Sequence, residues 1–340
     1  STADRDLARL DAIAALLPNP DLFVAMYVRH EAVLSSQIEG TQSTLEDVLA
    51  FEAQGTSNDT PKDVEEVINY VRAMNHGLRR LNELPLSLRL VREIHGELMH
   101  NVRGGEKTPG EFRTSQNWIG PAGSTLTNAS FVPPPPHELM NALGALEKFL
   151  HEGKTNTPLL VRCGLAHAQF ETIHPFLDGN GRIGRLLIAA LMEHWRLLPE
   201  PLMYLSGYLK QHQSAYYRQL SAIRTQGDWE GWVSFFLEGV AAAASEAERG
   251  IVAIASLIAA DRRRLLASPK AGPASYRLFE ALPMMPRFTV ELARQALNTS
   301  FPTANAAVKL LEDLGIVCEL TGQKKNRSYS YQAYIKLMAH

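Results

Sequence analysis

The stretch His174-Pro-Phe-Leu-Asp-Gly-Asn-Gly-Arg-Ile-Gly-Arg185 decides the fold of this chain, because it joins two helical patterns by a short turn. Pro175 disfavours helical geometry at the residue before it, so the first helix ends at His174. The following Asp-Gly-Asn-Gly is turn chemistry, since glycine and asparagine tolerate a positive φ. A second helix begins at Gly181 or Arg182 and is apolar almost all round. This pattern predicts a buried, central helix.

The same stretch carries the residue types of a site for nucleotide phosphates. A glycine-rich turn that opens a helix offers free backbone N–H groups and a partial positive charge, which together bind anions. Arg182 and Arg185 add charged donors suited to phosphate oxygens. Asp178 can hold a Mg²⁺ ion that bridges phosphates. His174 has the side chain whose ordinary pKa best suits a general base, so these residues predict transfer of a nucleotide phosphate.

Each of these residues also has a purely structural interpretation. A histidine before proline is more often a turn residue, and Asp-Gly-Asn-Gly alone is more often only a turn. However, arginines in the first turn of a helix oppose the helix dipole unless an anion compensates. This local conflict favours a binding site over a plain helix start.

The stretch resembles the signature of the Fic family, HxFx(D/E)GNGRxxR, at every motif position. Most members transfer AMP from ATP to a hydroxyl side chain (Ser, Thr or Tyr) of a target protein or of the enzyme itself. The resemblance implies a mainly α fold, a Fic-type helical bundle with a β-hairpin flap, with ATP as substrate and Mg²⁺ as cofactor. It assigns His174 as the base and Asp178 as the Mg²⁺ ligand. The implied nucleotide-binding residues are Gly179, Asn180, Gly181, Arg182, Gly184 and Arg185, with Arg185 on the γ-phosphate.

The two glycines of the turn bear on which group is transferred. The related Doc-type kinases carry bulkier residues at these positions and bind ATP reversed. Gly179 and Gly181 therefore favour nucleotidyl over phosphoryl transfer in this chain.

An N-terminal segment, Ser35-Ser-Gln-Ile-Glu-Gly40, extends the resemblance. From the residues alone, Ser35 and Glu39 share one helix face and Gly40 ends the helix, which is an ordinary helix end. The segment is similar to the family's inhibitory motif, (S/T)xxxE(G/N). The resemblance implies that Glu39 pairs with Arg185 and occupies the γ-phosphate position, since a carboxylate can compete with phosphate for an arginine. We therefore expect autoinhibition in cis.

Residues 112–136 show little helical periodicity. Their sequence predicts a β-hairpin followed by a polyproline exit, with a surface loop as the alternative. In Fic proteins this position is the flap, which clamps a target segment by main-chain pairing. The resemblance therefore implies that Trp118, Ile119 and Gly120 bind the target. Tyr217 is implied as a residue of the adenine pocket, with core packing as the alternative.

Length and composition predict two or three domains in an ordinary globular chain of 340 residues and 45% apolar content. We expect a helical N-terminal region at 1–88 with the inhibitory motif Ser35–Gly40, a catalytic core at 89–267 and a C-terminal domain at 268–340. The formal net charge of −2 creates no global field that recruits nucleic acid or membrane. The two distant cysteines fit a reducing compartment, and the apolar run 251–260 is too short to span a bilayer. We expect a cytoplasmic protein with no membrane partner.

The C-terminal region has three short helical patterns, at 276–282, 290–297 and 303–314, followed by a hairpin pattern. This order resembles a winged helix-turn-helix domain. The third helix carries no arginine, and the wing supplies only Lys324, Lys325 and Arg327, which is a thin footprint for phosphate contacts. DNA binding therefore stands beside protein interaction or homodimerisation as a role for this domain.

Two functions follow from these patterns. The favoured one is a Mg²⁺-dependent protein adenylyltransferase, regulated by Glu39, that modifies a target protein docked on the flap. The alternative is a DNA-binding transcriptional regulator that uses a nucleotide-sensing Fic core as a switch.

Overall fold

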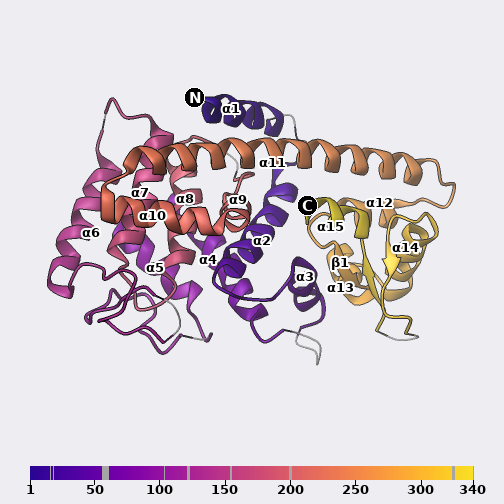
Figure 1. Cartoon of the computed structure of the whole chain (residues 1–340). Helices are drawn as coiled ribbons and strands as arrows, with labels where there is room; N and C mark the ends of the chain where they lie inside the picture. Colours follow the sequence, from indigo (N-terminus) through magenta and orange to yellow (C-terminus); the bar gives the residue numbers. More distant parts are fainter. Residues whose placement is uncertain are drawn as a thin grey trace.

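The protein is mainly α-helical, as the sequence predicts, and the helices of its larger part pack around one central pair, with the C-terminal helices set apart at the other end of the molecule (Figure 1). The structure is a computed structural model, and it describes residues 1–15, 17, 19–55, 61–102, 104–120, 123–153, 155–198, 201–323 and 326–339.

The central pair consists of α7 (Leu159–Ile173) and α8 (Asn180–His194). Almost every residue of α8 through Met192 is buried, which confirms the predicted buried helix. Helix α8 begins at Asn180, one residue before the first predicted position, and packs against α7, α4 and α5. The surrounding helices are α4 (Val64–Leu81), α5 (Leu88–Leu98), α6 (Pro136–His151), α9 (Ser206–Gln211) and α10 (Gln213–Gln226).

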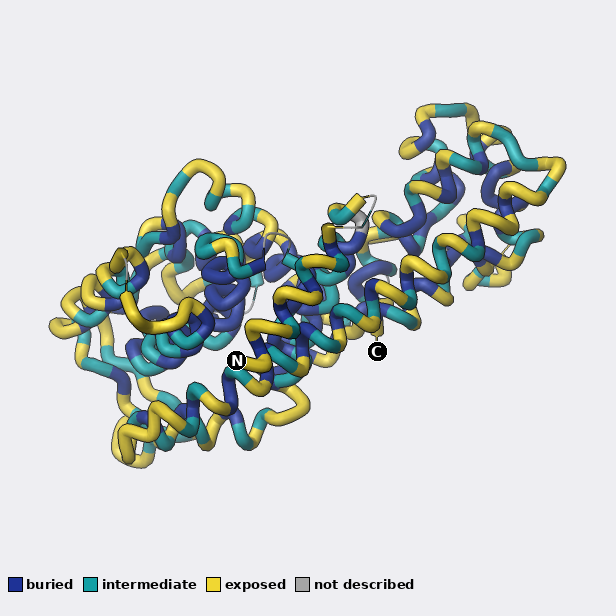
Figure 2. The backbone as a smooth tube through the Cα atoms, turned by 90° about the horizontal axis from the view of Figure 1, so that it is seen from above, coloured by how far each residue is buried: buried dark blue, intermediate teal, exposed yellow. Residues whose placement is uncertain are grey.

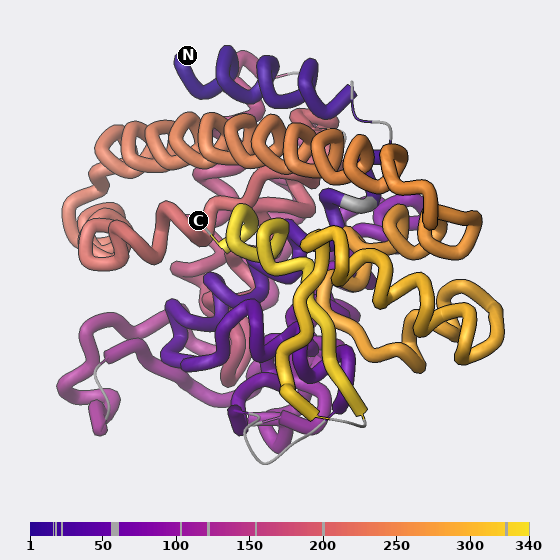
Figure 3. The backbone as a smooth tube through the Cα atoms, turned by 90° about the vertical axis from the view of Figure 1, so that its right-hand side faces the viewer, coloured from indigo at the N-terminus to yellow at the C-terminus, as the bar shows by residue number. Residues whose placement is uncertain are grey.

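The N-terminal helices close one side of this core. They are α1 (Thr2–Ala14), α2 (Pro20–Ile38) and α3 (Leu45–Gln54). Helix α1 lies along the long helix α11 (Trp229–Leu266) (Figure 3). Helix α2 packs against α4 and α9 and ends beside α8. The chain leaves α2 through Gly40, whose φ of +97° suits glycine.

Helix α11 has 38 residues and runs across the molecule from the core to the C-terminal part. At 1.5 Å per residue it is about 57 Å long. Its buried face includes Trp232 and Phe236, and Trp232 donates from its indole N–H to the carbonyl of Gly164 in α7 at 2.9 Å. The molecule is consequently elongated, with buried residues on the inner sides of its helices (Figure 2).

The C-terminal part contains the three predicted helices and the hairpin pattern, together with a strand and a helix that were not predicted. The sheet is antiparallel in the order β1-β3-β2, and Phe288 lies opposite Tyr329. The unpredicted elements are β1 and α15, and the wing residues Lys324 and Lys325 lie outside the described residues. The elements are α12 (Pro273–Ala281), β1 (Arg287–Thr289), α13 (Val290–Leu297), α14 (Phe301–Asp313), β2 (Cys318–Glu319), β3 (Ser328–Ser330) and α15 (Gln332–Met338).

The predicted flap hairpin at 112–136 is reduced, in the residues that the structure describes, to one antiparallel bridge. Ile119 N–H donates to the Phe131 carbonyl at 2.8 Å, and Phe131 N–H donates to the Ile119 carbonyl at 3.0 Å. The run of prolines 133–136 explains why the ladder stops there, since proline has no N–H to donate.

Among the described residues, no helix has the length and apolar character needed to cross a membrane.

Candidate active site

The first turn of α8 forms the floor of a cleft of about 770 Å³. The end of α2, helix α4, the flap, the end of α7 and helix α10 form its walls. The cleft brings together most of the predicted site residues. They are Glu39, Trp118, Ile119, Gly120, His174, Asp178, Gly179, Asn180, Gly181, Arg182, Arg185 and Tyr217.

Two predicted residues do not line the cleft. Ser35 lies behind it and bonds to the side chain of Arg185. Gly184 faces helix α7, where its carbonyl is 2.8 Å from His167 Nδ1. The role of Gly184 in nucleotide binding stays a prediction.

His174 leaves helix α7 in a left-handed conformation, with φ 50° and ψ 62°. Its carbonyl is fixed by two donors, Arg113 Nε at 3.0 Å and Asn117 Nδ2 at 3.1 Å. Burial, and after it the nearby Arg224 guanidinium, lower the pKa of His174 to about 4. The imidazole is therefore neutral near pH 7 and can accept a proton. In the described part of the chain its Nδ1 has no hydrogen-bond partner.

The turn after His174 is held from inside by Asn180. The Asn180 side chain accepts from the Phe176 N–H and donates to the Phe176 carbonyl, both at 2.8 Å. Gly179 has φ +76°, and a Cβ there would lie 3.0 Å from Met99 Sδ, so this position suits glycine. Asn180, predicted as a phosphate-binding residue, therefore also clamps the turn.

His95 supports the same turn from α5. Its ring stacks on Phe176 with the centroids 3.7 Å apart. Gly110 N–H donates to Nδ1 at 2.8 Å, so the ring proton is on Nε2, which donates to the Asp178 carbonyl at 3.1 Å. Burial lowers the pKa of His95 to about 4, which keeps the ring neutral for these two bonds.

Asp178 presents an ionised carboxylate at the edge of the cleft. Burial raises its pKa, but Lys107 Nζ at 2.9 Å and the Gly179 N–H at 2.7 Å lower it more, and the pKa lies below its ordinary value. A partly exposed carboxylate oxygen is the ligand type that Mg²⁺ takes when phosphates and waters complete its shell. No group of three or more metal-binding side chains occurs among the described residues. Asp178 is thus of the type that can hold Mg²⁺ only when oxygens from outside the protein complete the shell of the ion.

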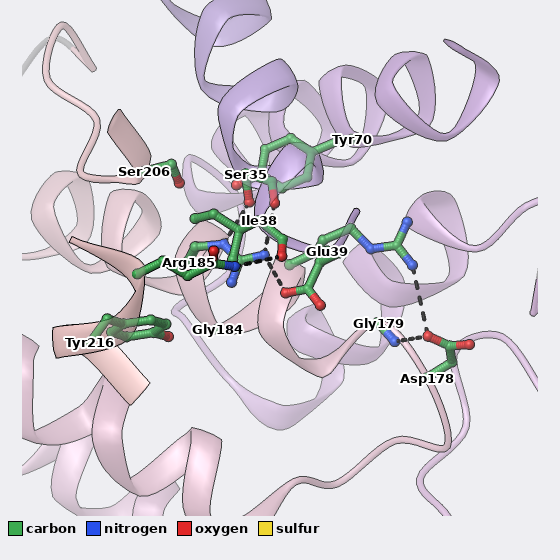
Figure 4. Close-up of polar contacts among 12 residues, drawn as sticks. Ser35, Ile38, Glu39, Tyr70, Asp178, Gly179, Gly184, Arg185, Ser206 and Tyr216 are labelled. Carbon is green, nitrogen blue, oxygen red and sulfur yellow. Dashed lines mark hydrogen bonds and ion pairs between the residues drawn. The ribbon is translucent and has the colours of Figure 1, made fainter. Parts of the chain in front are cut away.

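The two arginines of the motif are both buried and point to different partners. Arg182 Nη1 lies 3.4 Å from Glu66 Oε2 of α4. Arg185 reaches the end of α2, where Ser35 Oγ accepts from Nε at 2.8 Å and the Ser35 carbonyl accepts from Nη2 at 2.9 Å. Glu39 Oε1 accepts from the same Nη2 at 2.7 Å (Figure 4).

The Glu39 carboxylate lies directly on the first turn of α8. A Cβ added to Gly181 would collide with Glu39 Oε1 and approach Arg185 Nη1 to 3.1 Å. An anion at this point faces both the helix N-terminus and a guanidinium. The Glu39 carboxylate consequently lies where the positive ends of both groups meet.

Helix α2 is anchored behind this contact by Glu31. This buried carboxyl contacts Ser206 Oγ, and the Tyr70 hydroxyl donates to it at 3.2 Å. Glu31 and Ser35 are four residues apart and face the same way. The anchor therefore fixes the helix that presents Glu39 to Arg185.

The flap is tied to the motif by main-chain carbonyls that accept from one arginine. Arg113 is 2% exposed and donates to the carbonyls of His174 (3.0 Å), Ser115 (3.2 Å) and Pro134 (2.5 Å). Trp118 is 43% exposed, and its indole N–H donates to the Ser124 carbonyl at 2.9 Å. The flap thus reaches the cleft with its backbone fixed and its largest side chain exposed.

The two adjacent tyrosines of α10 lie in different surroundings, with Tyr216 in the core and Tyr217 at the cleft. The Tyr216 hydroxyl is buried and 2.9 Å from His167 Nε2. Tyr217 is 47% exposed at the mouth of the cleft, where an aromatic ring can contact a base. Its adenine-binding role stays a prediction.

Sequence reasoning missed Arg113, Glu171 and Arg224. Glu171 lies in the last turn of α7, three residues before His174 at the end of that helix, so its spacing from His174 was a signal for it. Arg113 and Arg224 bond to carbonyls of distant segments. A carbonyl acceptor is present at every residue, so no residue type marks it in a sequence.

Residues 1–79 match the family described as "Fic/DOC family N-terminal", and residues 85–192 match "Fic/DOC family". The chain belongs to the Fic/DOC family. The second match contains the whole of His174–Arg185, and the first contains Ser35–Gly40.

Curated relatives of this Fic protein share the matched region. "Protein adenylyltransferase Fic" of Drosophila grimshawi is 29% identical over 199 residues, which are 58% of this chain and 37% of the relative. The protein of that name from Aedes aegypti is also 29% identical over 199 residues, 58% of this chain and 36% of the relative. The matched part of the chain thus spans little more than a third of the length of these relatives.

Solved structures show the same fold. A Fic family protein from Desulfovibrio desulfuricans has a TM-score of 0.61 and 20% identity, and the match covers 96% of this chain and 94% of that one. Fic-1 from C. elegans has a TM-score of 0.52 and 21% identity, with 72% and 70% covered. The first match includes the C-terminal part as well as the core.

Proposed function

We propose that this Fic protein is a protein adenylyltransferase, which transfers AMP from ATP to a Ser, Thr or Tyr hydroxyl of a protein held at the flap. The observation that carries the proposal is a neutral His174 in one cleft with the anion-binding first turn of α8. The name "protein adenylyltransferase Fic" of the curated relatives supports it.

Phosphate binding falls to the turn and to the two arginines. The N–H groups of the α8 N-terminus and the Arg182 and Arg185 guanidinium groups supply the positive charge. Arg185 binds the terminal phosphate only after it releases Glu39, since both use the same Nη2. Glu39 therefore holds the enzyme in a resting state.

Mg²⁺ would be held by Asp178, once Lys107 releases the carboxylate oxygen that it contacts at 2.9 Å. When bound, the ion neutralises charge that develops on the phosphates. Gly104 leaves the room for this, because a Cβ there would lie 2.7 Å from Asp178 Oδ2.

The transfer step uses His174 as the base. The target oxygen attacks the α-phosphorus, the bond from that phosphorus to the diphosphate breaks, and the imidazole takes the hydroxyl proton. The left-handed backbone and the two bonds to its carbonyl fix where the ring points. A positioned base is worth about 10²–10⁴-fold in rate.

The proposal is tested with the Glu39→Gly protein, ATP and Mg²⁺. Label from α-labelled ATP should stay on protein, label from γ-labelled ATP should not, and the intact mass should rise by one AMP. Retention of the γ label would indicate phosphoryl transfer instead, and retention of neither would contradict the activity.

The matched control is the Glu39→Gly/His174→Ala protein. It should bind nucleotide as before, because the phosphate-binding groups remain, while transfer falls by about 10²–10⁴-fold. A residual rate above about one part in a hundred would contradict the role of the base.

A further inference from the structure

A second carboxyl group, which the proposed mechanism does not use, lines the cleft. Glu171 lies in the last turn of α7 and is 6% exposed. In the described part of the chain its Oε1 has no hydrogen-bond partner. A Cβ on Gly184 would collide with that oxygen. Glycine at 184 thus makes room for the carboxyl beside α8, next to Arg185.

The polar neighbours of Glu171 are already engaged with other groups. His167, on the same helix, is bonded through both ring nitrogens to the Gly184 carbonyl and the Tyr216 hydroxyl. Arg224 of α10 donates at 3.0 Å to the main-chain carbonyl of Glu171 and not to its carboxylate. Among the residues that the structure describes, the Glu171 carboxyl is therefore buried without a direct ion pair.

Three charged groups and one neutral imidazole surround Glu171. Arg185 of α8 and Arg224 of α10 favour its ionised form, and Glu39 at the end of α2 opposes it. His174, on the same helix, is neutral near pH 7. Burial dominates and raises the pKa of Glu171 to about 7. The carboxyl is thus close to the point where its two forms are equally populated.

Nucleotide binding makes the surroundings of Glu171 more negative. When a triphosphate replaces Glu39 on Arg185, several negative charges enter where one carboxylate was. Two acidic groups that share a buried site cannot both ionise without a large cost, so one of them takes a proton. A protonated carboxyl also gains an O–H donor, which an ionised one lacks.

We propose that Glu171 is a nucleotide-binding residue that enters the complex as the neutral acid and donates a hydrogen bond to the triphosphate, so that binding takes up one proton. The inference rests on the proposed function, because it requires ATP in this cleft. Its readout is binding and not transfer.

A proton taken up on binding makes the affinity for nucleotide depend on pH. Below pH 7 the free protein already carries this proton, so the affinity does not change. Above pH 7 the proton must be taken from solvent. The affinity for nucleotide therefore falls as pH rises, by up to about tenfold per pH unit.

The experiment is isothermal titration calorimetry of the Glu39→Gly protein with Mg²⁺ and an ATP analogue that has a methylene group between the α and β phosphorus atoms. Titrations at pH 8 in two buffers of different ionisation enthalpy measure the protons taken up. We expect about one proton per nucleotide and a Kd up to about tenfold weaker at pH 8 than at pH 7. Equal heats in the two buffers would overturn the inference.

The Glu39→Gly/Glu171→Gln protein is the decisive variant. Its amide is a permanent donor of similar shape, so it should bind with no proton uptake and a Kd that changes by less than about twofold between pH 7 and pH 8. Persistent uptake in this variant would overturn the inference. Should it fail to fold, the two-buffer titration of the parent still tests the uptake itself.

Two further variants identify the group. Glu31→Gln removes another buried acid, which contacts Ser206 outside the cleft, and should leave the uptake intact. His174→Asn should leave it intact as well, and loss of uptake there would assign the proton to the imidazole. Uptake without AMP transfer would contradict only the proposed function, whereas a protein that binds no nucleotide would overturn both.

Discussion

The two facing walls of the cleft are built by different means. The α2 wall reaches Arg185 with the side chains of Ser35 and Glu39 as well as one carbonyl. The flap wall is held by main chain, through the Ile119–Phe131 bridge and the carbonyls that accept from Arg113.

Under the proposed function, we expect the α2 wall to regulate the enzyme and the flap wall to bind the target. A charged side chain can be displaced by a ligand that offers the same charge, and one substitution removes it. A main-chain edge can pair with many peptide sequences, because its donors and acceptors do not depend on residue type. Substitutions should therefore act strongly on the α2 wall and weakly on the exposed side chains of the flap.

The largest effect is expected where the flap wall depends on a single side chain. Arg113→Ala would remove the donor of the Ser115 and Pro134 carbonyls and one of the two donors of the His174 carbonyl, and it would leave a cavity where the buried side chain was, so the free energy of unfolding should fall by about 3 kcal/mol. Urea denaturation measures it, with Arg113→Lys as the control that keeps the charge and part of the bonding. A loss under about 1 kcal/mol would show that the flap is held by other contacts.

Glu39→Gly should raise the initial rate of AMP transfer by about tenfold or more, because it removes the charge-assisted bond to Arg185. Glu39→Gln keeps the shape of the side chain and loses its charge, so its rate should lie between the rates of the parent and the Glu39→Gly protein. Equal rates for the parent and the Glu39→Gly protein in a labelled-ATP assay would show that the α2 wall does not regulate.

Ser35→Ala should have a smaller effect in the same direction. It removes one acceptor of Arg185 and leaves the Ser35 carbonyl. The contact between Arg185 and the end of α2 should therefore weaken by about 1 kcal/mol, and the rate of AMP transfer should rise about fivefold. Ser36→Ala is the matched control, since Ser36 Oγ has no hydrogen-bond partner in the described part of the chain. A similar rise in both variants would indicate general loosening of α2.

The smallest effect is expected for the exposed flap side chain. Trp118→Ala should change transfer to a protein target by less than about twofold, because pairing uses the backbone. Ile119→Pro removes the N–H that bonds to Phe131 and should lower transfer much more. A large loss of transfer in the Trp118→Ala protein alone would mean that the flap recognises the target through its side chains.

The features of the fold that depend on residues close together in the chain could be predicted from the sequence. Proline after His174, the glycine turn and the apolar helix that follows all act within a few residues, and the ends of the two helices were predicted to within one residue. The pairing of Arg185 with Glu39 spans 146 positions in the chain, and it was expected only because both ends carry a recognisable motif.

The remaining contacts depend on tertiary packing that local patterns do not carry. The unpartnered carboxyl of Glu171 depends on space above Gly184. Strand β1 has three residues and pairs with β3 more than thirty positions later, so its pattern is too short to stand out. The flap ladder was overestimated because the prolines remove its donors.

The left-handed His174, held through its carbonyl by Arg113 and Asn117, has a kinetic consequence. Under the proposed function, the base would already be in place while Glu39 keeps the nucleotide from Arg185. Activation would then require only that the exposed Glu39 side chain turn away, a motion of picoseconds to nanoseconds, and no segment would have to fold. We therefore expect the speed of the response to be set by the event that draws Glu39 away, and not by the catalytic centre.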